Sequence, residues 1–240
     1  MSARPSPIER LQRAIRDRFS PQEALGLHLT IGVLVILLAG WCFSEIAENL
    51  GPTTAQVALD QRVTNWFHAH AFAQLTAVAR AITFCGSVGF VAAVSLACAV
   101  YFAARRAWNR FIALLATVLG GSLLNILLKH FFHRHRPVLE NPLVTLSSFG
   151  FPSGHTMGAT LLYGLLALIA LRFVKRAGTR IALVTGAIVL IALIGLTRIY
   201  LGAHFLSDVL GAIAIGVAWL ALCWTAAETF RKRRGRASAR

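Results

Sequence analysis

The feature that most constrains this chain is a series of long apolar stretches without a charged residue. Five of them are long enough, or nearly so, to cross the roughly 30 Å hydrocarbon layer of a membrane as helices. A sixth starts near Thr156, inside the uncharged segment Asn141–Leu171. We therefore expect an all-α, polytopic membrane protein with six transmembrane helices. The five longer stretches are Ala24–Ser44, Ala81–Ala104, Phe111–Leu128, Ile181–Thr197 and Val209–Ala227.

The composition excludes the main alternatives. Hydrophobic residues make up 57% of the chain and charged residues only 14%, whereas a soluble domain carries about 25% charged residues. The chain is too apolar to be a soluble enzyme and too hydrophobic to be disordered. We interpret its four scattered cysteines as small apolar residues, with a disulfide as the alternative, because their spacing is not that of a metal site. They are Cys42, Cys85, Cys98 and Cys223.

The net charge of +15 is explained by membrane topology. In a six-span arrangement, 18 of the 24 basic residues lie on one side, in residues 1–23, 105–110, 172–180 and 228–240. Basic residues collect on the cytoplasmic side, so we expect both termini there and a multi-pass protein of the inner (plasma) membrane. We expect one membrane-embedded domain over 1–240, with cytoplasmic tails at 1–23 and 228–240. No nucleic-acid partner is needed to explain the charge.

The stretch of about 36 residues between the first two spans is too polar to cross the bilayer. Leu59, Val63, Trp66 and Phe67 recur with helical spacing and predict an amphipathic helix. It either lies in the outer membrane interface, where Trp is favoured, or packs on the other spans.

Four of the six remaining basic residues lie near histidines at the predicted span ends that share the outer side. Lysine and arginine side chains there could bind phosphate oxygens, and a Ser-Gly pair before a helix could add backbone N–H donors. His204 and Asp208 are one helical turn apart, so the carboxylate could orient the imidazole for nucleophilic attack, and His155 could act as a general acid. These residues point to phosphoryl transfer. The candidate phosphate-binding residues are Lys129, Arg136, Ser153, Gly154 and Arg198.

These segments together resemble the three-part signature of the type 2 phosphatidic acid phosphatase family, in the superfamily of the vanadium haloperoxidases. Thr197 stands where many members have serine, but it keeps the hydroxyl. The signature consists of Lys129 followed after six residues by Arg136-Pro137, then Pro152-Ser153-Gly154-His155, then Arg198 followed after five residues by His204 and after three more by Asp208.

The resemblance implies a metal-independent phosphatase of lipid phosphate or diphosphate esters that needs no cofactor. It implies that His204 forms a phosphohistidine, that Asp208 orients it, and that His155 protonates the leaving alkoxide. The five candidate phosphate-binding residues would hold the phosphate oxygens. Phosphatidylglycerol phosphate, phosphatidic acid, polyprenyl diphosphate and lipid A phosphate are all possible substrates, and we expect a broad activity.

Three alternatives stay open at this stage. His130, His133 and His135 could form a metal site, although two of them alternate with arginines that would repel a cation. A lipid transporter would also place charges near the membrane, although none of the charges here lies in the middle of a span. A phosphotransferase acting between envelope lipids would use the same residues. Beyond lipid substrates and membrane lipids, we expect no obligatory protein partner.

Overall fold

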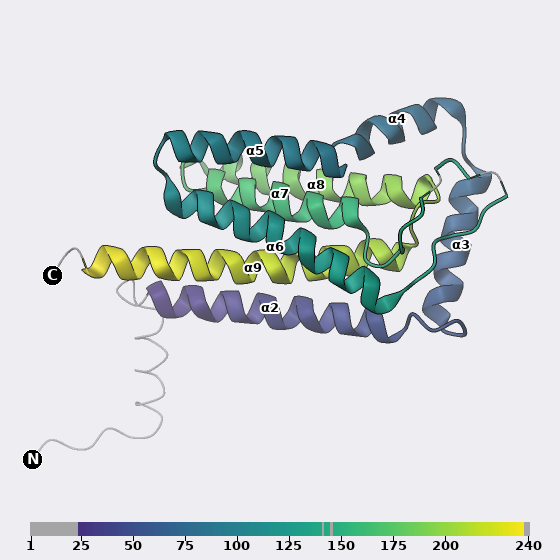
Figure 1. The fold of residues 1–240 in the computed structure, drawn as a ribbon, viewed down its shortest axis with the longest axis horizontal. Helices are drawn as coiled ribbons and strands as arrows, with labels where there is room; N and C mark the ends of the chain where they lie inside the picture. The colour runs from purple at the N-terminus through teal and green to yellow at the C-terminus, as the bar shows by residue number, and fades with distance from the viewer. Residues whose placement is uncertain (1–23, 141, 145, 238–240) are drawn as a thin grey trace, which may run out of the picture.

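The computed structural model describes residues 24–140, 142–144 and 146–237, and within these residues it contains helices and no strand (Figure 1). The predicted tail 1–23 and the last three residues of the predicted tail 228–240 lie outside the described residues. The helices are α2 (Ala24–Glu48), α3 (Ala55–Ala69), α4 (Ala73–Phe84), α5 (Val88–Ala104), α6 (Trp108–Phe132), α7 (Gly154–Ala170), α8 (Ala177–Tyr200) and α9 (Leu206–Ala237).

The shortest apolar helix, α7, lies at the centre of the bundle. It packs against α5, α6, α8 and α9, while α2 lies along α9 (Figure 1). Leu162 and Leu165 of α7 and Leu114 of α6 are fully buried. The outer helices instead expose large apolar side chains such as Leu37 and Leu119. A bundle with a packed centre and an apolar exterior is suited to a lipid environment, so the expectation of an all-α membrane protein is confirmed.

Five helical segments are long and apolar enough to cross a membrane, namely Leu27–Glu48, Ala73–Ala104, Trp108–Phe132, Ala177–Tyr200 and Leu206–Lys232. They contain four of the five longer predicted spans entirely and overlap the first, Ala24–Ser44, from Leu27 onward. The sixth, α7, has 17 residues, which is the lower limit for crossing. The count of six spans therefore stays a prediction.

The span predicted over Ala81–Ala104 is not one unbroken helix, because the chain turns at Cys85–Ser87 between α4 and α5. A Cβ atom on Gly86 would lie 2.6 Å from Ile194 Cγ2 and 3.1 Å from the His155 carbonyl oxygen. Tyr163 donates its hydroxyl to the Cys85 carbonyl at 2.7 Å, and Ser87 caps α5. The break thus allows a close approach to α7 and α8. The Cys85 carbonyl at the break keeps a hydrogen-bond partner in the Tyr163 hydroxyl.

The predicted amphipathic helix is α3, which lies across one end of the bundle (Figure 1) and contacts α8 and α9. Its buried residues are polar, Asp60 and Thr64, whereas Leu59 and Trp66 of the apolar stripe are exposed. The helix therefore packs on the bundle through its polar side, as one of the two expectations has it, and leaves part of its apolar stripe exposed; its place in the membrane interface stays a prediction. We call this end of the bundle the site end.

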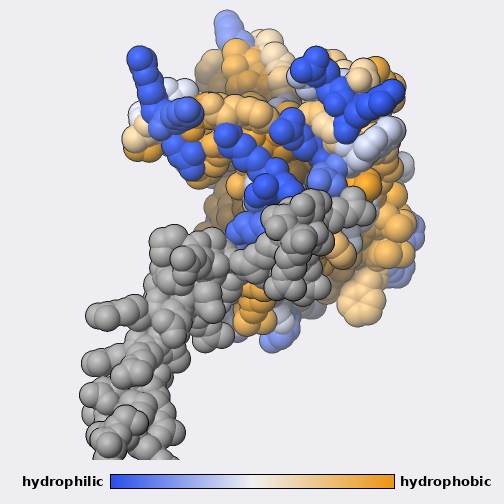
Figure 2. All heavy atoms as spheres, turned by 90° about the vertical axis from the view of Figure 1, so that its left-hand side faces the viewer, coloured by the Kyte–Doolittle hydropathy of each residue, from blue (hydrophilic) through white to orange (hydrophobic). Residues whose placement is uncertain are grey.

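The opposite end, which we call the basic end, carries the α5–α6 turn, the α7–α8 loop and the C-terminal part of α9 (Figure 1). Figure 2 views this end directly and shows hydrophilic residues gathered on it, with hydrophobic residues beside and behind them. Arg105, Arg106, Arg172 and Arg231 belong to this end. The described basic segments that were predicted to share one side of the membrane therefore lie together.

Candidate active site

The three signature segments meet at the site end. They come from the end of α6 and the loop after it, the start of α7, the end of α8 and the start of α9 (Figure 1). The backbone N–H of Ser153 donates to the Asp208 carbonyl at 3.0 Å, and Arg136 contacts His204. The predicted convergence is therefore observed, and it brings all the candidate residues into one region.

The His204 and Asp208 side chains form the buried centre of this region. His204 is 2% exposed and Asp208 is fully buried. The imidazole Nδ1 lies 3.3 Å from Asp208 Oδ2, and the same oxygen accepts the Phe205 backbone N–H at 2.9 Å. The carboxylate is thus held at the start of α9, where the helix dipole favours a negative charge.

A tight turn places His204 beside Arg198. The backbone N–H groups of Ala203 and His204 both donate to the Arg198 carbonyl, at 3.0 and 3.3 Å. Gly202 within this turn has φ of +68°, a left-handed conformation that glycine adopts without strain. The turn explains why five residues separate the arginine from the histidine in the third segment.

Arg136 determines which nitrogen of His204 carries the proton. Its Nη1 lies 3.1 Å from His204 Nε2 and also donates to the Ala203 carbonyl at 2.6 Å. Because a guanidinium only donates, Nε2 must present its lone pair and Nδ1 must hold the proton that faces Asp208. Nε2 is therefore the atom available to attack a phosphorus.

His204 is neutral at physiological pH. The pKa of His204 falls from 6.5 to about 4, chiefly because of burial. The charges of Arg136 and Arg198 also lower it, while the hydrogen bond to Asp208 acts in the opposite direction. A neutral imidazole is the form that can act as a nucleophile.

Arg198 and Lys129 extend the positive region around His204. Arg198 is 3% exposed and donates from Nη1 to Thr83 Oγ1 at 3.1 Å, while its buried Nε has no hydrogen-bond partner among the described residues. Lys129 donates from Nζ to the Phe149 carbonyl. It also interacts electrostatically with Arg136, Asp208 and Arg198, which places it in the same region.

The start of α7 supplies neutral donors. Ser153 is the N-cap residue but its side chain makes no capping bond, and instead its hydroxyl accepts from Thr156 Oγ1 at 3.0 Å. The N–H groups of Gly154 and His155 are in the first turn, where helical N–H groups have no intrahelical partner. The half-buried His155 side chain interacts electrostatically with Arg198, His204, Arg136 and Lys129.

Sequence reasoning missed an ion-pair network behind the histidine. Arg134 donates from Nη1 to Asp208 Oδ1 at 2.6 Å and from Nη2 to Asp60 Oδ2 at 2.7 Å. Asp60, 1% exposed, also accepts the Ser207 backbone N–H at 2.9 Å and the Ser207 hydroxyl. No motif spacing links α3 to this site. The only available signal was a lone carboxylate on the polar side of a predicted amphipathic helix.

The charges of the site do not balance. Among the described residues, both site carboxylates, Asp60 and Asp208, pair with Arg134, and Lys129, Arg136 and Arg198 form no ion pair. Arg198 is buried and Lys129 and Arg136 are half-buried, and cations shielded from water without a counter-charge are costly. Their arrangement around His204 Nε2 is suited to an anion with several oxygens, such as a phosphate.

The alternative metal site is not assembled. Among the described residues, no group of three or more His, Cys, Asp or Glu side chains lies close enough to hold a metal ion. His130 Nδ1 lies 2.8 Å from the Ile126 carbonyl, and His133 packs edge-on against Phe149. The four cysteines are free and half-buried.

Comparison with known proteins agrees with the resemblance of the three-part sequence signature. The family model described as the PAP2 superfamily matches residues 109–232. Phosphatidylglycerophosphatase B of Bacillus subtilis (strain 168) is 38% identical over 117 residues, which cover 47% of this chain and 55% of the relative. The match thus spans only about half the length of that curated relative.

Two solved structures are similar. The crystal structure of a transmembrane PAP2-type phosphatidylglycerolphosphate phosphatase from Bacillus subtilis has a TM-score of 0.72 and 28% identity, over 82% of this chain and 96% of that chain. The crystal structure of Aquifex aeolicus LpxE has a TM-score of 0.55 and 23% identity, over 69% and 94%. At that identity the second likeness concerns the fold alone.

Proposed function

The chain belongs to the PAP2 superfamily, and from that premise we propose that it is a metal-independent membrane phosphatase that hydrolyses lipid phosphate or diphosphate esters. The observation that carries the proposal is the unbalanced charge of the site. Lys129, Arg136 and Arg198 surround the neutral His204 without carboxylate partners among the described residues, and the buried Arg198 Nε lacks a partner there. A phosphate ester supplies the missing negative charge and acceptors.

In the first step, Nε2 of His204 attacks the phosphorus and the bond between phosphorus and the leaving oxygen breaks. Arg136 contacts Nε2 in the free protein and would move its donor to a phosphate oxygen. Asp208 stabilises the positive charge that develops on the imidazole. His155 gives its proton to the leaving alkoxide, and the bound phosphate offsets the surrounding cations that otherwise oppose protonation of His155.

In the second step, a water molecule attacks the phosphohistidine. His155, now neutral, takes a proton from this water, the bond between phosphorus and Nε2 breaks, and inorganic phosphate leaves. Ser153, Gly154 and the three cations hold the phosphoryl oxygens through both steps, where negative charge develops. The reaction balances without a metal or a redox partner.

An apolar groove next to the site supports a lipid substrate. A cavity of about 470 Å³ follows α5 and α6 from Gly154 and Gly86 at the site end to Ala99. Val88 and Leu119 on its rim are exposed. An acyl or prenyl chain could lie here while its phosphate reaches His204. Because the curated relative and the similar crystal structure are both named for phosphatidylglycerol phosphate phosphatase activity, we propose this lipid as one substrate within a broad range that includes phosphatidic acid and polyprenyl diphosphate.

The site end would face the outside of the inner membrane. The basic end carries the described loops that are rich in arginine, and such loops stay cytoplasmic. Lipid phosphates in the outer leaflet would then be the accessible substrates.

The experiment is phosphate release by the purified full-length protein in detergent, across a panel of these lipids. We expect turnover that vanadate inhibits and EDTA does not abolish, that His204→Ala eliminates, and that His130→Ala largely retains. Loss of all activity in EDTA, restored by zinc or magnesium, would instead support a metal site at the histidines after α6. A labelled phosphoryl group that appears on a second lipid rather than in free phosphate would identify a phosphotransferase.

A further inference from the structure

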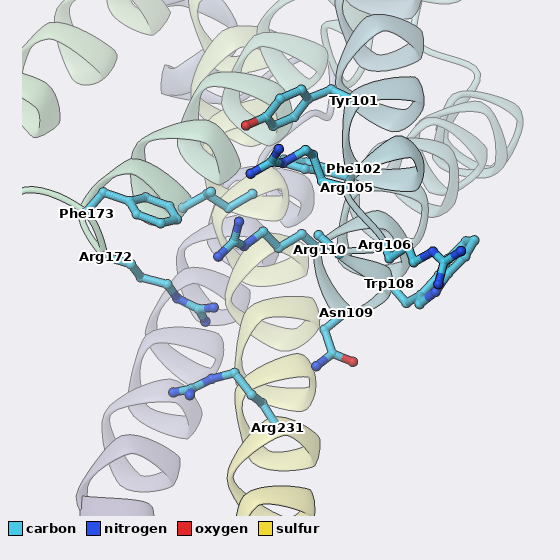
Figure 3. Close-up of a pocket in the computed structure, with 12 residues that line it drawn as sticks. Tyr101, Phe102, Arg105, Arg106, Trp108, Asn109, Arg110, Arg172, Phe173 and Arg231 are labelled. Atoms are coloured by element: carbon cyan, nitrogen blue, oxygen red, sulfur yellow. The ribbon is translucent and has the colours of Figure 1, made fainter.

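A cavity of about 840 Å³ outside the candidate site lies at the basic end, between the α5–α6 turn, the α7–α8 loop and α9. In Figure 3, the guanidinium groups of Arg105 and Arg110 extend toward Arg172, which approaches from the other side, and Arg231 points into the same region. Figure 3 also shows Phe173 beside these groups. Arginines from separate parts of the chain therefore share one cavity.

The positive charge of this cavity is only partly neutralised. Within the described part of the chain, Glu228 is the carboxylate that pairs with Arg172 and Arg231, and Arg105 and Arg110 form no ion pair. Burial lowers the pKa of Arg172, and the charges of Arg231 and Arg110 lower it as well, whereas Glu228 raises it. The guanidinium groups therefore repel one another, and an anion between them would relieve this repulsion.

Aromatic rings hold two of these arginines in place. The Arg110 guanidinium lies 4.8 Å from the centroid of the Phe173 ring, and that of Arg172 lies 4.3 Å from the Trp224 ring. Such contacts stabilise a cation and limit the entropy that it loses on binding a ligand. The cavity is thus better ordered than a set of free arginines on a surface.

An apolar groove begins where the basic cavity ends. A second cavity, of about 400 Å³, lies between α6 and α9, and Asn109 lines both cavities. The groove continues past Ala226 and Ala113 to Ala116 and Trp219, along the apolar outside of the bundle. A free phosphate would use the basic cavity alone, whereas a phospholipid would use both.

We propose that the basic end binds an anionic phospholipid, with its phosphodiester headgroup among Arg105, Arg110 and Arg172 and an acyl chain in the groove between α6 and α9. This site lies at the opposite end of the bundle from His204 and is distinct from the proposed substrate site. A bound lipid would anchor the α7–α8 loop to α6 and α9 in the leaflet at the basic end.

The test is retention of cardiolipin by the purified full-length protein, measured by native mass spectrometry as an apparent Kd, with phosphatidylcholine as the uncharged comparison. Arg105→Gln combined with Arg110→Gln should weaken cardiolipin binding about tenfold or more. The matched control combines Lys175→Gln with Arg176→Gln. It removes the same charge from exposed residues that do not line the cavity, and it should change the Kd less than about twofold.

A second pair of variants tests the lipid chain. Ala226→Leu narrows the groove and should weaken cardiolipin binding, whereas Ala182→Leu, at an exposed position on α8, should not. Equal weakening by the two charge-removing pairs, or equal binding of phosphatidylcholine, would overturn the proposal. Displacement of cardiolipin by millimolar inorganic phosphate, with Ala226→Leu unchanged, would show that the cavity binds phosphate alone. None of these readouts requires turnover.

Discussion

Replacing Asp60 with asparagine tests whether α3 helps to build the catalytic centre. The carboxylate is 1% exposed and pairs with Arg134 at 2.7 Å, and it accepts the backbone N–H of Ser207 at 2.9 Å. Arg134 in turn holds Asp208. The substitution keeps the shape of the side chain but removes the charge, so Arg134 is left with Asp208 as its only anionic partner among the described residues.

The expected size of the effect follows from these contacts. Hydrogen bonds to charged groups contribute about 1.5–3 kcal/mol each, and removing one partner of a buried pair costs about 3–5 kcal/mol. The asparagine oxygen can still accept the Ser207 N–H, so Asp60→Asn should destabilise the protein by about 2–4 kcal/mol. In the variant, Arg134 should interact more strongly with Asp208, its remaining carboxylate partner. We therefore expect kcat to fall about ten- to a hundredfold, with KM nearly unchanged.

The assay combines unfolding of the full chain in mixed detergent micelles with kcat and KM for a lipid phosphate. Arg62→Gln is the control, since it removes an exposed charge from the same helix. A double-mutant cycle with Arg134→Gln should give a coupling energy of at least about 1 kcal/mol. A positioning role for Asp60 would be refuted by an unchanged kcat together with a stability change below about 0.5 kcal/mol that is additive with that of Arg134→Gln.

Three further predictions concern the chemistry and the topology. If His155 is the general acid, His155→Ala should lose about 10²–10⁴-fold in kcat/KM on an alkyl lipid phosphate but much less on nitrophenyl phosphate, and an equal loss on both would remove the acid role. Because burial lowers the pKa of His204 to about 4, the unfolded chain binds a proton between pH 6.5 and 4 that the folded protein does not. The unfolding free energy should therefore fall by about 3 kcal/mol across that window relative to His204→Gln; parallel pH profiles would contradict this. A cysteine replacing the exposed Glu140 should react with a membrane-impermeant thiol reagent in intact cells, and labelling only after lysis would reverse the proposed topology.

The sequence by itself determined the class of protein and which residues make up the candidate site. Hydropathy depends on local composition, so the apolar runs located the long helices, as for Phe111–Leu128 inside α6. The candidate residues could be found because their spacing follows from local geometry. His204 and Asp208 are one helical turn apart, and Ser153 immediately precedes α7.

Only the tertiary structure decided which distant residues support the site. Asp60 reaches Ser207 across 147 positions of the chain, and Thr83 reaches Arg198 across 115. The break at Cys85–Ser87 likewise depends on how closely Gly86 approaches α7 and α8. The polar side of α3 is buried because Asp60 meets Arg134 in the loop after α6 and Ser207 at the start of α9. The spacing of the apolar stripe alone was compatible with two positions of the helix. Contacts of this kind depend on how helices pack, and packing is a property of the whole bundle that no local stretch of residues encodes.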